Sequence, residues 1–302
     1  MNQAPPIKVT VKPWPAIAAL LTVLAAPAFF VFEDLFAGVL LLVLGLAAAG
    51  YSDRGGCGAA CSLPLSRDEL KLRGRRASVP RPPSLLRDLS LIGLGLAIVR
   101  TISLTARLDN WAMVSFTLAL GGAVVVPYLV SRFVYRDPAV GFLWRGGGRW
   151  GRLHWIWLVA VILLAWLLLP VYFMGSGVYQ NWPAVDSPDI IARLFIGVGA
   201  VGIWDELFFI CTVFAVLLRH FPIWAANTLQ TIVFVSFLWE LGYRSWGPLL
   251  TIPFALVQGY IFVRTRSLAY VVTVHLIFDA IVFAVLVHAH NPALFDWFPL
   301  AP

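Results

Sequence analysis

Long runs of apolar residues constrain the fold of this chain more than any other feature of its sequence. Nine such runs are present, at roughly 14–32, 35–51, 89–106, 111–131, 154–173, 190–218, 222–240, 247–263 and 268–288. Lipid offers no hydrogen-bond partner to the backbone, so each run is expected to be an α-helix, and no barrel-type alternation of apolar and polar residues occurs. The sequence predicts an all-α fold, a polytopic membrane helical bundle with about nine transmembrane helices.

The composition supports the same class of protein. Of the 302 residues, 60% are hydrophobic and only 12% are charged, which is more apolar surface than a soluble core can bury. The net charge of +7 does not indicate nucleic-acid binding, because the basic residues cluster in short loops between the apolar runs. We therefore expect an integral membrane protein of a bacterial inner membrane, with the lipid bilayer and no nucleic acid as its partner.

Two basic loops, at 54–88 and 132–152, predict the orientation in the membrane. They lie on the same side of the predicted topology as Lys8, Lys12, Arg219, Arg264 and Arg266, whereas the opposite side holds little besides Arg107 and Arg244. Cytoplasmic loops carry the excess of Lys and Arg. The N-terminus is therefore expected in the cytoplasm and the C-terminal tail outside.

The chain divides into four expected segments. A membrane hairpin at 1–53 is followed by a basic cytoplasmic loop at 54–88, a second helix pair with its basic loop at 89–153, and a helical core at 154–302. The first apolar run resembles a signal peptide, but the next run follows at once, which favours an uncleaved hairpin. The Pro, Gly and Ser of the 54–88 loop indicate a connector that anchors the topology, with binding of anionic headgroups as the alternative. Free thiols are expected at Cys57, Cys61 and Cys211.

Chemistry-bearing side chains interrupt the later apolar runs. The stretch "GIWDELFFIC" carries Asp205 and Glu206, the next run ends with Glu240, and the last holds His275 and Asp279 one helical turn apart. An ionised Asp at the centre of a membrane helix costs on the order of 2.5 to 3.5 kcal/mol, so these groups are expected to turn inward and converge. The alternative is that they form interhelical hydrogen bonds that only stabilise the bundle.

At these positions the sequence resembles the CPBP family, the CAAX-protease and bacteriocin-processing group of glutamic intramembrane proteases. The family pattern has a helix with EExxxR, a later helix with an FxxxH-like motif, and a final segment that ends in HxxxN. Here "DELFFI", "SFLWE" and "GYIFVRTRSLAYVVTVHLIFDA" stand in that order, and the resemblance covers roughly 190–288. It implies a membrane protein or lipidated peptide as substrate.

The resemblance also implies roles for single residues. Asp205 would activate a water molecule, Glu206 would support it, and His275 with Asp279 would hold the oxyanion of the attacked amide. A carboxylate can act as a general base in such a cavity, and preorganised donors stabilise the charge that develops on the carbonyl oxygen. No cofactor is required by this scheme.

Three positions depart from the family pattern. Asp205 is one methylene shorter than the usual Glu, Ile210 replaces the arginine, and Glu240 is placed where the family has its first histidine. Without the arginine, Glu206 is expected to be neutral or to accept a hydrogen bond from a hydroxyl, an amide or a tryptophan N–H on a neighbouring helix.

These departures leave several functions open. Asp205 and Glu240 could share a proton in a working protease, because two like charges in an apolar cavity cannot both stay ionised. A divalent cation at Asp205, Glu240 and His275, with Asp279 as a further ligand, is a second hypothesis. The others are a catalytically inactive CPBP-like scaffold or binding protein and, from another class, a proton-coupled transporter. Nothing in the sequence indicates an oligomeric state.

Overall fold

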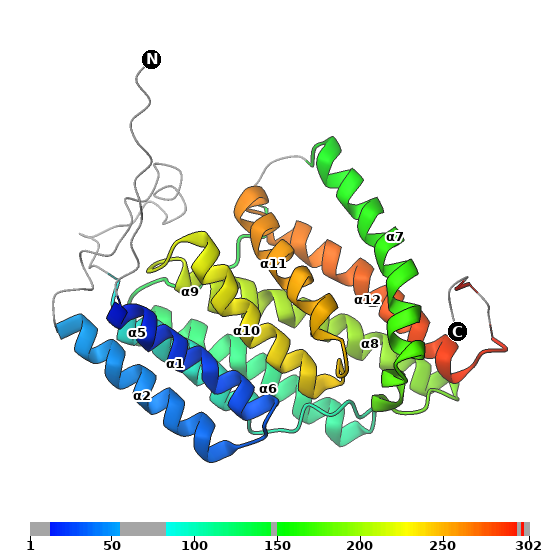
Figure 1. The fold of residues 1–302 in the computed structure, drawn as a ribbon, viewed down its shortest axis with the longest axis horizontal. Coiled ribbons are helices and arrows are strands. Elements are labelled where there is room, and N and C mark those ends of the chain that lie inside the picture. Colours follow the sequence, from blue (N-terminus) through cyan, green and yellow to red (C-terminus); the bar gives the residue numbers. More distant parts are fainter. Residues whose placement is uncertain (1–12, 55–82, 146–149, 295–296, 299–302) are drawn as a thin grey trace.

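The structure, a computed structural model, describes residues 13–54, 83–145, 150–294 and 297–298, which are helical with short connections and contain no strand (Figure 1). The nine long helices of this part are α1 (Pro13–Phe30), α2 (Leu35–Arg54), α5 (Leu85–Val99), α6 (Asn110–Leu129), α7 (Arg152–Gly175), α8 (Pro188–Asp205), α10 (Ile223–Leu241), α11 (Pro248–Thr265) and α12 (Leu268–His290). The shorter elements are η1 (Val130–Val134), η2 (Val178–Asn181), η3 (Glu206–Phe214) and α9 (Ala215–Leu217). The predicted helical membrane bundle is confirmed.

Some sequence-based expectations fall outside the described residues. They concern Lys8 and Lys12 near the N-terminus, and Cys57 and Cys61 with most of the basic loop at 54–88. The third cysteine, Cys211, lies within the described part and is buried as a free thiol.

Seven segments of the described chain are long and apolar enough to cross a membrane. They are 13–30, 35–54, 110–134, 152–175, 188–217, 248–265 and 268–290. The other two predicted spans became α5 and α10. Helix α5 has 15 residues, or about 22 Å, which is shorter than the apolar thickness of a bilayer. Helix α10 has 19 residues, but buried polar side chains such as Asn227, Gln230 and Glu240 lower its hydropathy.

The described parts of the loops that were predicted to share the cytoplasmic side lie together at one end of the bundle, which we call the basic end. Arg219 donates to Asp88 at 2.8 Å and to Asp137 at 2.6 Å, so three loops far apart in the sequence meet there. The N–H of Leu268 donates to the carbonyl of Leu143 at 2.8 Å, which adds the loop between α11 and α12. The predicted grouping of the loops is thus reproduced, and its assignment to the cytoplasm stays a prediction.

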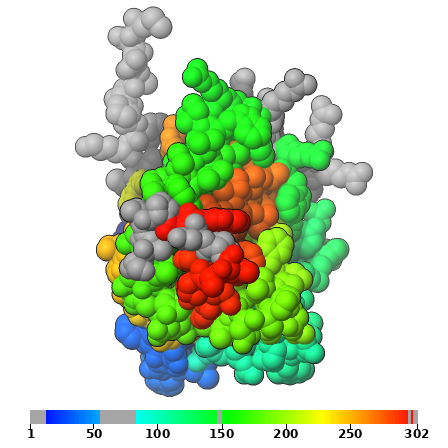
Figure 2. Space-filling view, turned by 90° about the vertical axis from the view of Figure 1, so that its right-hand side faces the viewer, coloured from blue at the N-terminus to red at the C-terminus, as the bar shows by residue number. Residues whose placement is uncertain are grey.

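The remaining loops meet at the opposite end. Arg193 of α8 donates to the carbonyl of Leu108 at 3.1 Å, and Asn181 donates to the carbonyl of Gly242 at 2.8 Å. Figure 2 views the side of the molecule where α7 (green) and α8 (yellow-green) each pack against α12 (orange to red). Helices α7 and α8 flank α12, so α12 is held from two sides along its length.

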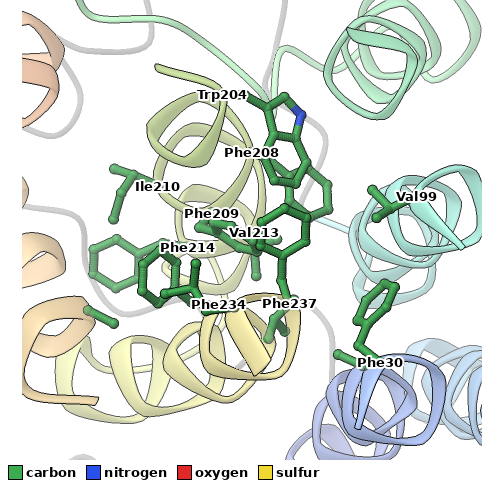
Figure 3. Close-up of a cluster of buried hydrophobic side chains, with 14 of the residues drawn as sticks. Phe30, Val99, Trp204, Phe208, Phe209, Ile210, Val213, Phe214, Phe234 and Phe237 are labelled. Atoms are coloured by element: carbon green, nitrogen blue, oxygen red, sulfur yellow. The ribbon is translucent and has the colours of Figure 1, made fainter. Parts of the chain in front are cut away.

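An aromatic cluster in the core fixes the segment from α8 into η3 (Figure 3). The rings of Trp204 and Phe208 stack with their centroids 5.1 Å apart, and Trp204 also meets Phe237 of α10 at 4.8 Å. The indole N–H of Trp204 donates to the carbonyl of Leu120 on α6 at 2.7 Å. Each aromatic pair stabilises the fold by about 0.5 to 1.5 kcal/mol more than the burial of its surface area alone. The residues next to Trp204 in the sequence are consequently held on a rigid part of the bundle.

Candidate active site

Four of the five predicted site residues converge in the interior. His275 of α12 lies between two carboxylates that are adjacent in the sequence: its Nδ1 is 2.8 Å from Oε1 of Glu206, and its Nε2 is 3.5 Å from Oδ2 of Asp205. The same Nε2 is 3.9 Å from Oδ1 of Asp279. All four residues are at most 7% exposed. The expectation that these groups turn inward and toward each other is met for this set.

A change of helix type separates the two adjacent carboxylates. Asp205 is the last residue of α8, and Glu206 opens the π-helix η3. Asp205 lines a large cavity together with His275 and Asp279, whereas Glu206 lies behind them, beside a much smaller cavity that it shares with Gln258. π-helical turns occur frequently at functional sites. The transition at this point gives each carboxylate its own environment.

Glu206 accepts a hydrogen bond from a side-chain amide, where the family pattern has an arginine as its partner. Gln258 of α11 donates from Nε2 to Oε1 of Glu206 at 2.9 Å and to the carbonyl of Val271 at 3.1 Å. The side chain of Ile210, at the arginine position, lines the same small cavity as Gln258. The prediction that Glu206 would accept a hydrogen bond from a neighbouring helix is confirmed, and its donor is an uncharged one.

The large cavity has a volume of about 420 Å³ and lies mainly between α6, α8, α10 and α12. Its wall is largely apolar, with Leu120 and Phe254 among the side chains, and Asp205, His275 and Asp279 are among its polar residues. Tyr243, which follows α10, also lines it. Binding cavities typically combine an apolar wall with a few convergent polar groups in this way.

Glu240 does not join the site, which corrects the expectation that it would. Its Oε1 accepts a hydrogen bond from the backbone N–H of Leu104, in the loop after α5, at 3.0 Å. Glu240 does not line the large cavity. Near the end of α10, its side chain faces α5 rather than α12. Neither the Asp205–Glu240 dyad nor the metal site formed by Asp205, Glu240 and His275 is assembled, and no other metal-binding cluster was found among the described residues.

The family comparison identifies the same part of the chain. Residues 187–281 match the model of the family described as type II CAAX prenyl endopeptidase Rce1-like, and this segment contains all four clustered residues. No curated protein and no solved structure matched the chain. The predicted resemblance to the CPBP family is confirmed over these residues. The match supports the scaffold of a CAAX-type intramembrane protease for this segment.

The cavity also explains why Glu240 was assigned wrongly to the histidine position. An FxxxH motif that starts at Phe234 ends at Leu238, two residues before Glu240. Both Phe234 and Leu238 line the large cavity. A motif that starts at Phe237 would end at Leu241, which also lines the cavity, so either register places an apolar residue at the final position of the motif.

Sequence reasoning missed two further polar residues of the site, Gln258 and Tyr243. Gln258 precedes the glycine of "VQGYIFVRT", where a buried amide inside an apolar run was a signal that could have been used. Tyr243 follows the helix end in "WELGYRSWG", and only the three-dimensional turn brings it back to the cavity.

Replacing Glu240 with glutamine is expected to leave activity close to that of the wild type, because the residue lies outside the cavity and glutamine still offers an oxygen to the N–H of Leu104. Glu240→Ala removes that acceptor and is expected to lower the melting temperature in detergent. Cleavage rates and melting curves of both variants test the assignment. A loss of activity in Glu240→Gln with an unchanged melting temperature would show that Glu240 takes part in catalysis.

Gly202 sets the distance between α8 and α12. A Cβ built at this position collides with Oδ2 of Asp279, so alanine is expected to displace that carboxylate and to reduce activity strongly. Gly199, nearly one turn earlier on α8, is the matched control, since its Cβ would meet only Leu276 Cδ2 at 4.0 Å. In an open position the same change stabilises a helix by roughly 0.5 to 1 kcal/mol. Equal cleavage rates in Gly202→Ala and Gly199→Ala would show that the contact has no effect.

Proposed function

We propose that the protein is an intramembrane endopeptidase of a bacterial inner membrane that cleaves a membrane-associated peptide or a C-terminal segment with a water molecule activated by Asp205. One observation carries this proposal. A buried carboxylate faces a cavity of about 420 Å³, and the imidazole of His275 lies 3.5 Å behind it. A general base must lie within reach of the proton that it removes and be held in a fixed orientation.

The neighbouring contacts give each residue a part in the proposed reaction. Asp205 takes the proton of a water molecule in the cavity, and the water oxygen attacks the carbonyl carbon of the substrate. His275 orients Asp205 and is itself held at 2.8 Å by Glu206. Gln258 fixes Glu206, so a chain of contacts runs from α11 through η3 and α12 to the reacting side of the site. Rigid support of this kind preserves the geometry that catalysis requires.

The experiment is a comparison of membrane-protein termini in cells that carry the wild-type chain or the Asp205→Asn variant at equal levels. The proposal expects new termini within or beside apolar segments only with the wild type. Purified wild-type protein in liposomes should then cleave a synthetic peptide that contains the identified site. An inactive scaffold predicts identical termini in both strains and no cleavage of any peptide, and a transporter predicts ion flux without cleavage. Either result would overturn the proposal.

A further inference from the structure

The proposed reaction needs a hydrogen-bond donor for the oxyanion, and the two residues suggested for this role are otherwise engaged. Both ring nitrogens of His275 face carboxylates, Nδ1 toward Glu206 and Nε2 toward Asp205 and Asp279. An ionised Asp279 has only acceptor oxygens. An FxxxH motif read from Phe234 ends at Leu238, whose side chain has no polar atom. A further donor is therefore sought among the other polar residues that line the cavity.

Tyr243 is one of the polar residues in the wall of the large cavity. It lines the large cavity together with Asp205, His275 and Asp279, and it is 8% exposed. Three aromatic rings fix its own ring: Tyr172 stacks on it at 6.4 Å, and Phe173 and Trp182 meet it edge-on at 5.6 and 5.3 Å. A substrate bound in this cavity would meet the ring of Tyr243 in the cavity wall.

The turn after α10 directs Tyr243 toward the cavity. Gly242 adopts φ of 132°, a backbone conformation that side chains rarely allow, and a Cβ there would come within 2.9 Å of the Trp182 ring. The N–H of Tyr243 then closes the turn onto the carbonyl of Leu238 at 2.9 Å. Leu238 and Tyr243 thus sit at the same end of α10, and both contribute to the cavity wall.

The environment keeps this hydroxyl protonated. Tyr243 lies in the loop between α10 and α11, outside the membrane-spanning segments. Burial, and after it the nearby carboxylate of Asp279, raises the pKa of Tyr243 well above its usual range. A phenol that retains its proton is a donor at all physiological pH values. Because the surrounding aromatic rings already hold the side chain in position, it does not have to reorganise when the oxyanion forms.

We propose that Tyr243 is a catalytic residue that donates a hydrogen bond to the oxyanion, the part that a histidine would play in an FxxxH motif. In this step the water oxygen bonds to the carbonyl carbon, Asp205 takes the water proton, and the π pair of the carbonyl moves onto its oxygen. The O–H of Tyr243 stabilises that negative charge. When the intermediate collapses, the C–N bond breaks and the leaving nitrogen takes the proton back from Asp205. The assignment rests on the proposed endopeptidase function.

The test compares Tyr243→Phe and Tyr243→His with the wild type on a peptide that the wild type cleaves. Removing one oxyanion donor typically lowers kcat by about 10² to 10³-fold, so Tyr243→Phe is expected to lose that much in kcat with little change in KM and in melting temperature. Tyr243→His keeps a donor and should retain more kcat than Tyr243→Phe. A purely structural role predicts the reverse order, because phenylalanine preserves the packing of the ring and histidine does not.

Tyr270→Phe is the matched control. Tyr270 is 1% exposed, and its hydroxyl donates to the carbonyl of His154 at 2.8 Å, away from the large cavity. Its loss is expected to lower stability and to leave kcat unchanged. A Tyr243→Phe variant that is as active as Tyr243→His, or as active as the wild type, would overturn the assignment while Asp205→Asn remains inactive. A wild type with no more activity than Asp205→Asn would overturn the proposed function and this inference with it.

Discussion

Asparagine at position 205 is expected to lower the rate of peptide cleavage by about 10² to 10⁴-fold, the usual contribution of a general base. The amide has the shape of the carboxylate but cannot accept the proton of water. Because Oδ1 of Asp205 has no hydrogen-bond partner within the described residues and Oδ2 is 3.5 Å from His275, the variant should fold normally. The measurement is the initial cleavage rate of purified protein in liposomes, with melting curves as the check on folding.

The matched control for this variant is Glu240→Gln, which makes the same chemical change at a carboxylate outside the cavity. It should cleave at a rate near that of the wild type. Similar rates for Asp205→Asn and the wild type would remove Asp205 from the mechanism. Similar losses in both variants would instead point to a general requirement for buried negative charge.

The second large effect is expected at the basic end, where replacing Arg219 with methionine should destabilise the fold by about 3 kcal/mol. Arg219 pairs with Asp88 at 2.8 Å and with Asp137 at 2.6 Å, and the side chains of Arg219 and Asp88 are only 12% and 2% exposed. Its loss leaves Asp88 buried with His220 as its remaining partner, at 2.7 Å. Unfolding in one detergent by denaturant or heat measures the effect.

A surface ion pair provides the comparison. Arg107 and Asp109 lie 2.9 Å apart, but their side chains are 68% and 45% exposed, so solvent screens the pair. Arg107→Met is therefore expected to change stability by less than about 1 kcal/mol. Equal destabilisation by the two substitutions would mean that Arg219 contributes through its aliphatic packing and not through its charge.

The fold was predictable because the lipid environment leaves few alternatives. Each of the nine apolar runs became a long helix, and the loops grouped by their basic residues meet at one end of the bundle. The prediction that α5 and α10 are membrane spans was less accurate. The length of an apolar run does not show how far packing against neighbouring helices can make up for a segment that is short or contains polar residues. That compensation depends on packing between distant residues.

The site was predictable only in part, for a related reason. The cost of charge in lipid correctly predicted that Asp205, Glu206, His275 and Asp279 would face inward. The cost of charge in lipid does not determine which interior cavity or neighbouring helix each group faces. Glu240 is as buried as the others, yet it binds the loop at Leu104, because one residue along a helix rotates a side chain by about 100°. Tyr243 was missed because a loop turn, which has no periodicity, directs it.

The π-helix that begins at Glu206 has a consequence for how this segment can change over time. A π-helix has a wider turn than an α-helix, so η3 accommodates an additional residue within the same helical rise. Deleting one residue of Glu206–Phe214 would let the segment return to α-helical turns, and the residues that follow could keep their present faces. Substitutions in η3 can be absorbed locally by repacking. A one-residue deletion would remove the π-helical turn instead, and with it the change of helix type between Asp205 and Glu206.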